Sequence, residues 1–231
     1  MKLLIAAFAA SALAVSARAA DLPVVASRLT TGPASHVDLT NMSTQPVIAW
    51  TLVVTIVQRN GTTRRTVETI DAYLSEVTRD FPGMSSKVDR LMPGQTREIM
   101  LDAVAEGSVA EITAVILEDG TAAGDRETIA SIFESRARER DQLREIVQVF
   151  DAVLPSTRGA AALEELKRRF ASPSSQEEST AHRAAREAID AYLQRTTAAN
   201  ADAIDQLVRA YAGIVRREYE LAERHSHQKT P

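Results

Sequence analysis

The chain of 231 residues contains no cysteine. This absence excludes disulfide bonds, a cysteine nucleophile and a lipid-modified N-terminal cysteine. Aromatic residues make up 4% of the chain, too few for a platform that stacks bases or sugars. After the first twenty residues no apolar run approaches the ~20 residues that span a bilayer. The longest, VIAWTLVVTIV (47–57), is rich in β-branched residues and predicts a strand.

Sequence motifs of several enzyme classes are also missing. The chain has no H-E-x-x-H, G-x-S-x-G, P-loop or G-x-G-x-x-G motif. The sequence does not exclude a Ser–His–Asp triad, because the members of a triad meet only in space. However, no serine lies in an elbow-like motif. The sequence therefore identifies no catalytic, cofactor-binding or metal-binding residue, and no cofactor.

The first twenty residues, MKLLIAAFAASALAVSARAA, have the pattern of a secretory signal peptide. Lys2 provides the positive start, an apolar run extends from Leu3 to Val15, and Ala17-Arg18-Ala19 forms an A-x-A cleavage site. We expect cleavage after Ala19 or Ala20 and a periplasmic or extracellular mature chain. The alternative is an N-terminal membrane anchor, but the apolar run is too short to span.

The charge of the chain argues against a polyanionic partner. The formal net charge is -4, and removal of Lys2 and Arg18 changes it by two to -6. An acidic chain repels nucleic acid. Arg outnumbers Lys by 23 to 4 and Ala is abundant, a composition typical of GC-rich bacterial genomes.

Apolar residues alternate with polar ones from Val24 to about Leu117. In the longest run, even positions 48–56 form one face and odd positions 47–57 form the other, as in a central strand of a two-layer β structure. Shorter runs contain Val37 and Leu39, Ile99 and Leu101, and residues 110–116. About seven short strands predict an immunoglobulin-like antiparallel β-sandwich over residues 21–124, with Trp50 in its core.

Turn signals separate these runs at Gly32-Pro33, Asn60-Gly61, Phe81-Pro82-Gly83 and Pro93-Gly94. Asn60-Gly61 predicts a tight hairpin because both residues tolerate positive φ. The less regular segment 73–91 is expected to be a long crossing loop.

Two of these segments carry a family resemblance. LTNMSTQPVIAW (39–50) and LMPGQTREIML (91–101) resemble bacterial immunoglobulin-like domains of the adhesion-module (CARDB-like) kind, over residues 24–118. In that family an Asn closes one strand and a Pro-Gly precedes another. The resemblance implies a sandwich fold in an exported protein. It implies no active site, since its motifs concern turns.

From Asp125 onward the apolar repeat becomes helical. It predicts a helical domain over residues 125–224, with helices at about 125–154, 157–171, 175–199 and 201–223 and a disordered tail at 225–231. Ser174 and Glu177 have the spacing of a capping box. The fold class is therefore α+β: a sandwich, a long helix and a helical hairpin or bundle.

The apolar stripes predict how these helices pack. In the first helix, apolar residues at 128–133 should pack on the strands and those at 143–154 on other helices, while the charged segment ESRARERDQ (134–142) crosses solvent. The third helix has a stripe of Ala181, Ala185, Ile189 and Tyr192. The fourth has one of Ile204, Leu207, Val208, Tyr211, Ile214 and Val215. The last two helices are expected to form an antiparallel hairpin.

An acidic stretch, AVILEDGTAAGDRETI (114–129), stands between the two repeats. Four carboxylates suggest a calcium site, but their spacing does not fit a known loop. The alternative assigns each residue a structural role. Asp119-Gly120 is then a two-residue hairpin turn, residues 121–123 a short last strand, and Gly124 a change of direction. Asp125 caps the first helix, and Glu127 favours its positive end.

The remaining candidates are histidines and arginines. His225 and His227 have an H-x-H spacing but lie in the polar tail without a third ligand, and His36 and His182 are expected to be isolated and exposed. Arg136, Arg138, Arg140 and Arg144 alternate with acids. We interpret them as a solvated helix face with Glu134–Arg138 and Arg136–Glu139 ion pairs, rather than as a nucleic-acid site.

These observations favour an exported bacterial protein that serves as a non-enzymatic protein-interaction or structural module. The alternative is a hydrolase with a dispersed site between the two domains, where His, Ser and acids with perturbed ionisation would converge. A third hypothesis is self-assembly, in which the Ala-rich C-terminal helices pair between chains. We expect a protein partner, no nucleic acid, no cofactor and no transmembrane segment after signal cleavage.

Overall fold

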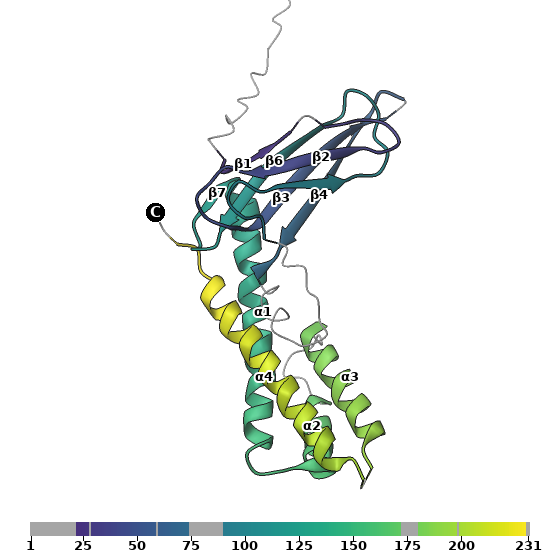
Figure 1. The fold of residues 1–231 in the computed structure, drawn as a ribbon, viewed down its shortest axis with the longest axis vertical. Helices are drawn as coiled ribbons and strands as arrows, with labels where there is room; N and C mark the ends of the chain where they lie inside the picture. Colours follow the sequence, from purple (N-terminus) through teal and green to yellow (C-terminus); the bar gives the residue numbers. More distant parts are fainter. Residues whose placement is uncertain are drawn as a thin grey trace, which may run out of the picture.

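The computed structural model describes residues 22–27, 29–58, 60–73, 90–171, 180–197 and 199–229. Within them the chain is mixed α+β, with seven strands in two antiparallel sheets and four helices (Figure 1). The predicted α+β class is confirmed at this level. The expected signal peptide, most of the expected crossing loop and the Ser174–Glu177 box lie outside the described residues.

The seven strands pair in two separate sheets. One sheet has the order β1-β2-β5 and the other β4-β3-β6-β7, with all neighbours antiparallel. β3 is one of the two inner strands of the second sheet, as its two apolar faces predict. The strands are β1 (Val24–Ala26), β2 (His36–Asn41), β3 (Val47–Val57), β4 (Thr63–Asp71), β5 (Thr96–Met100), β6 (Val109–Leu117) and β7 (Ala122–Gly124).

An apolar core lies between the two sheets. It includes Val37 and Leu39 from the first sheet and Trp50 and Val115 from the second. Trp50 is buried, and the guanidinium of Arg97 lies 5.3 Å above its ring. The prediction that Trp50 belongs to the core is therefore confirmed.

The strict alternation predicted along β3 is wrong at its start. The register with β6 shifts between Val47 and Ala49, which makes Ile48 an extra residue. Val47 therefore joins Trp50 between the sheets, whereas Ile48 and Ala49 both lie in the core on the helix side. A β-bulge changes the face on which the following side chains lie.

The Asp119-Gly120 hairpin loop has three residues, one more than the two-residue turn that was predicted. The N–H of Leu117 donates to the carbonyl of Thr121 at 2.8 Å, so residues 118–120 form the loop. Gly120 has φ 87°, and no described residue other than glycine has positive φ. A left-handed glycine at the end of a three-residue loop is common in β-hairpins. The Asn60-Gly61 loop closes with the same hydrogen bonds.

The helices are α1 (Arg126–Val153), α2 (Gly159–Phe170), α3 (Thr180–Arg195) and α4 (Ala201–His225). The first turns of α1 pack on the outer face of the β4-β3-β6-β7 sheet, where Ile129, Ile132 and Phe133 meet Ala114 and Ile116. The rest of α1 extends away from the sheets with α2, α3 and α4 beside it (Figure 1). The predicted packing of the first apolar block on the strands is thus confirmed.

The last two helices run antiparallel and touch, as at the rings of Tyr192 and Tyr211, which lie 6.5 Å apart, but the predicted hairpin is not their main packing contact (Figure 1). α4 packs mainly along α1, whereas α3 packs mainly on α2. The aromatic ring of Phe150 makes edge contacts with Phe170 of α2 and Tyr211 of α4, which ties both helices to α1. Leu207, predicted on the apolar stripe of α4, is half exposed because the contact runs through Ile204 and Val208.

The predicted disordered tail at 225–231 is also wrong over its described part. α4 continues to His225, Ser226 is buried, and the N–H of Lys229 donates to the carbonyl of Gly120 at 3.1 Å. The chain thus returns to the sheets, and its last described residues bind the hairpin loop that precedes β7 (Figure 1).

Gly124, the last residue of β7, lies close to the backbone of β6 just before α1 begins. Its φ is 117°, and a Cβ added there would lie 2.2 Å from the carbonyl oxygen of Thr113. That carbonyl accepts the N–H of Asp125 at 2.7 Å, so it is held in place. Glycine is therefore required here both for its backbone angle and for space.

We predict that Gly124→Ala lowers the free energy of unfolding by more than about 3 kcal/mol, since it combines left-handed strain with a backbone clash. The matched control is Gly61→Ala, which has φ 80° and nothing within 4 Å of its added Cβ. The control should cost about 1–2 kcal/mol. Urea unfolding of both variants measures the difference, and equal losses would contradict the prediction.

Candidate functional site

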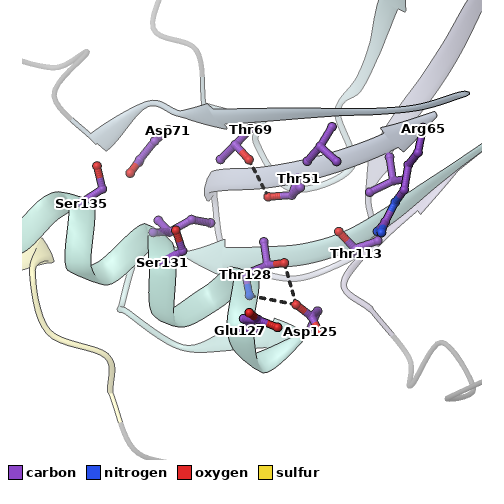
Figure 2. Close-up of a pocket in the computed structure, with 13 residues that line it drawn as sticks. Thr51, Arg65, Thr69, Asp71, Thr113, Asp125, Glu127, Thr128, Ser131 and Ser135 are labelled. Carbon is purple, nitrogen blue, oxygen red and sulfur yellow. Dashed lines mark hydrogen bonds between the residues drawn. The ribbon is translucent and has the colours of Figure 1, made fainter. Parts of the chain in front are cut away.

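A groove of about 870 Å³ lies between the first turns of α1 and the outer face of β3 and β4 (Figure 2). Its floor is formed by Thr51 and Val53 of β3 and by alternate residues of β4. Its wall is one face of α1. Its lining residues are Thr51, Val53, Arg65, Val67, Thr69, Asp71, Thr113, Asp125, Glu127, Thr128, Ser131, Ile132 and Ser135.

The two repeats of the sequence explain why these side chains meet. Along β4, every second residue from Arg65 to Asp71 points to one face of the sheet, as in any strand. Along α1, residues 128, 131, 132 and 135 lie on one face because they are three or four apart. The groove is therefore a product of the change from strand to helix at Asp125.

Hydroxyl groups dominate the groove. Thr51 and Thr69 are opposite each other in the register and their hydroxyls hydrogen-bond at 3.0 Å. Figure 2 shows Ser131 and Ser135 on α1 facing the strands that carry Thr69 and Asp71. Within the part of the chain that the structure describes, the two serine hydroxyls make no hydrogen bond, so both are available to a ligand.

Charged groups lie at the two ends of the groove. At one end, Arg65 lies near Asp125, whose carboxylate accepts from the N–H and the hydroxyl of Thr128 at 2.8 and 2.6 Å. Those hydrogen bonds, with a smaller contribution from Arg65, lower the pKa of Asp125 below its usual value. At the other end stands Asp71, and Glu127 lies on the wall.

The lining suits binding better than bond cleavage. It contains hydroxyls, carboxylates and one guanidinium, but no histidine or lysine among the described residues. The described lining therefore contains no Ser–His pair, and its carboxylates and hydroxyls can all hydrogen-bond to a ligand. From Arg65 to Asp71 the floor extends about 20 Å at the rise of a β-strand, which is the length of about six extended residues.

The Asp71 end of the groove adjoins a buried ion pair. Arg136 of α1 is 1% exposed, and its Nε and Nη2 both donate to the Asp71 carboxylate at 2.8 Å. Its Nη1 donates to the carbonyl of His225 at 3.1 Å. The guanidinium lies 4.8 Å from the ring of Tyr73 and 5.3 Å from that of Phe133. One side chain thus joins β4, α1 and the end of α4.

This arrangement corrects the interpretation of residues 134–142 as a solvated segment. Arg136 does not pair with Glu139, because Asp71 occupies its guanidinium and Tyr73 donates its hydroxyl to Glu139. Arg140 is 17% exposed and its Nη1 donates to the Ser226 hydroxyl at 3.1 Å. Arg138 is exposed and Arg144 pairs with Asp141, so these two alone match the expected solvated face.

Two further acids and a phenol complete this region, which we call the joint: Asp71, Tyr73, Arg136, Glu139, Arg140, Glu218, His225 and Ser226. Burial and the hydrogen bond to Glu139 raise the pKa of Tyr73 above its usual range. Burial, and then the negative charge of Glu139, raise the pKa of Glu218 on α4 to about 7. Glu218 therefore changes its charge near neutral pH.

The acidic stretch at 114–129 holds no cation-binding cluster. Among the described residues no three His, Cys, Asp or Glu side chains lie together as metal ligands. Glu118 pairs with Arg90, Asp119 accepts from the N–H of Thr121 at 2.9 Å, and Asp125 caps α1. The structural interpretation of this stretch is confirmed for the cap, the last strand and the glycines.

The histidines do not converge either. His182 is buried with its ring 5.3 Å from Phe170, so the expectation that it is exposed is wrong. His36 lies beside Thr30 in the first sheet. The ring of His225 lies 6.0 Å from that of Tyr73, whereas His227 is exposed. No described helix is long and apolar enough to cross a membrane.

Comparisons with known proteins add no assignment, since no family model, no curated protein and no solved structure matches the chain. The groove and the joint were both missed by the sequence. Their only signals are the alternate Arg65–Asp71 positions of one strand and a run of hydroxyls on one face of the first helix.

We predict that the two members of the buried pair differ in their effect on stability. Asp71→Asn leaves a permanent, buried cation without its anion and should cost about 3 kcal/mol or more. Arg136→Met keeps the packing between the rings, and it leaves Asp71, which is 24% exposed, able to hydrate. It should cost about 1–2 kcal/mol. Urea unfolding at pH 8 compares them, and a larger loss for Arg136→Met would refute this asymmetry.

We further predict that Glu218 makes stability depend on pH. Because the folded chain holds this proton more tightly than the unfolded chain, whose pKa is near 4.5, the free energy of unfolding falls as pH rises from about 4.5 to about 7. The upper limit of this loss is on the order of 3 kcal/mol. Glu218→Gln should make the free energy of unfolding, measured in urea, depend less on pH between pH 5 and 8.

The matched control for this measurement is Glu220→Gln, which changes an exposed carboxylate on the same helix. It should reproduce the wild-type profile. If Glu218→Gln also reproduces that profile, the carboxylate does not carry the pH dependence.

Proposed function

We propose that residues 22–124 form an immunoglobulin-like sandwich that presents a binding groove on one outer face. The support for this fold is the order β1-β2-β5 facing β4-β3-β6-β7, with every neighbouring pair antiparallel. A second support is that the two segments of the CARDB-like resemblance, residues 39–50 and 91–101, touch each other.

Asn41 joins those two segments. Its side-chain amide nitrogen donates to the carbonyls of Gln45 and Leu91 at 2.8 Å each. Its side-chain oxygen accepts from the N–H and the hydroxyl of Ser43 at 2.9 and 2.7 Å. Its backbone carbonyl accepts from Gly94 at 2.9 Å. An Asn at the end of one strand is therefore fixed to the Pro-Gly turn before another, which supports a common fold for the two segments.

The protein's role is that of an exported, non-enzymatic bacterial module that holds a partner protein. Export is supported by the pattern of residues 1–20, and a bacterial source by the excess of Arg over Lys. The single observation that carries the binding role is the groove beside α1, whose described lining has two serine hydroxyls without hydrogen bonds and no histidine.

The occupant that best fits the groove is an extended segment of a partner protein. The ~20 Å floor matches about six residues of extended chain. Ser131 and Ser135 offer hydrogen bonds to peptide groups or polar side chains, and none of the lining residues is aromatic, which disfavours a sugar ligand. Arg65, Asp125 and Glu127 give one end of the groove mixed charge, and at the other end Asp71 is engaged by Arg136 (Figure 2). Hydrogen bonding rather than net charge therefore favours an extended polar segment.

The alternative, a hydrolase with its site between the sheets and the helices, has weaker support. His, Ser and acids do meet at the joint, and the pKa of Glu218 is raised. However, Arg136 fills the joint, and the Ser226 hydroxyl is engaged by Arg140 and by the carbonyl of Glu223. Of the large exposed apolar side chains in the described residues, only Leu207 lies on α3 or α4, which gives helix-mediated self-assembly little support.

We predict that filling the groove abolishes capture of the partner. Ser131→Trp places a large side chain in the groove, whereas Ala130→Trp places the same side chain on an exposed part of α1 that does not line it. Each variant is expressed with residues 1–20 intact and a C-terminal tag, and it is cross-linked in an envelope extract. A protein recovered with the wild type and with Ala130→Trp, but not with Ser131→Trp, is the expected result.

Circular dichroism and melting temperature should show that both variants are folded. Recovery of the same protein with Ser131→Trp would refute binding in the groove. Recovery of nothing above background across several detergents and salt concentrations would refute the binding role itself. The mass of the tagged chain recovered from the envelope tests export, since cleavage after Ala19 or Ala20 is expected.

A further inference from the structure

The strand β4 presents an open edge. Among the described residues its only strand neighbour is β3, and the two pair without interruption from Val57↔Thr63 to Ala49↔Asp71. Eight of its nine residues are exposed and the ninth, Ile70, is partly exposed. It contains no proline or glycine. An edge of this kind carries a row of unpaired N–H and C=O groups that can accept another strand.

The helices leave this edge accessible. α1 packs on the sheet mainly at β6 and β7, on the far side of β3 from β4. It reaches β4 at Asp71, the last residue of the strand, while the groove separates it from Arg65, Val67 and Thr69. Side chains alone therefore decide which strand can pair here.

The sequence of β4, TRRTVETID, is complementary to itself when two copies run antiparallel about Thr66. Arg64 then stands opposite Glu68 of the other copy, and this pairing occurs twice. Thr63 stands opposite Thr69, and Arg65 opposite Val67, whose exposed methyl groups can pack on the arginine stem. Opposite charges across a strand pair favour association, and like charges oppose it.

Neighbouring registers lack this complementarity. A two-fold axis at Arg65 places that arginine opposite its own copy. An axis at Val67 places Arg64 opposite Ile70 and forms no ion pair. The charge pattern therefore selects both the partner and the register.

We propose that β4 pairs with β4 of a second copy of this chain about a two-fold axis at Thr66. The two four-stranded sheets then form one sheet of eight strands. Residues directly opposite in such a pair lie on the same face, so both α1 helices stand on one side of the joined sheet. The two grooves then face each other across the axis. This pairing does not depend on what the groove binds.

Charge exchange tests the pairing. Arg64→Glu and Glu68→Arg each replace two attractive pairs by two repulsive pairs and should weaken the dimer at least about tenfold. A mixture of the two variants restores opposite charges at all four positions and should form a heterodimer. The double variant Arg64→Glu/Glu68→Arg should dimerise like the wild type. Sedimentation velocity of the mature chain over a range of concentrations measures each case.

A single cysteine tests the axis, because the chain contains no other. At Thr66 the two Cα atoms of the dimer would be about 4.5–5.5 Å apart, within the range of a disulfide. Thr66→Cys should therefore form a covalent dimer under mild oxidation. The control is Thr63→Cys on the same exposed strand, whose two copies would be about 20 Å apart and should form no disulfide within the dimer.

Several outcomes would overturn the proposal. A wild type that stays monomeric at all concentrations excludes the dimer. A wild-type dimer that neither charge variant weakens, with Thr66→Cys and Thr63→Cys equally cross-linked or both monomeric, places the contact elsewhere, for example on the C-terminal helices. Circular dichroism of every variant checks that loss of dimer is not loss of fold.

Discussion

The buried pair of Arg136 and Asp71 is the constraint on which the arrangement of this molecule depends. A guanidinium cannot lose its charge, so a position that is 1% exposed is tolerable only when an anion and further acceptors surround it. Asp71 from the last residue of β4 and the carbonyl of His225 from the end of α4 meet this need. Contacts with β4 and with the end of α4 therefore fix the direction in which α1 leaves the sheet.

The same pair links the two candidate sites. Asp71 lines one end of the groove and anchors Arg136 at the joint, while Glu139 and Glu218 place negative charge on the other side of the same helices. The apolar core on this side is continuous, from Ile48 and Ile116 of the sheet to Phe150 and Val208 of the helices. The strands and the helices thus share one core and do not fold as two separate bodies.

Sequence analysis was most successful for structural features that are determined by residues close in the sequence. Asp125 as a cap, the need for glycine at 120 and 124, and the apolar stripes of α1 and α3 follow from neighbours within a few positions. It failed where the cause was distant. The bulge at Ile48 depends on β6, the burial of Arg136 on an aspartate 65 positions earlier, and the burial of His182 on Phe170. The groove was invisible for the same reason, since it needs two elements that are adjacent only in space.

The hydrogen bond between Lys229 and Gly120 has a mechanical meaning. The helical region enters next to Thr113 and Gly124, and it leaves beside the loop at Gly120, a few residues away in the same hairpin. A tension applied at Lys229 therefore acts first on the β6–β7 hairpin, in the body of the sheet. The helices stay held against the sheet by Arg136 and by the shared core, so they bear such a load only after the hairpin yields.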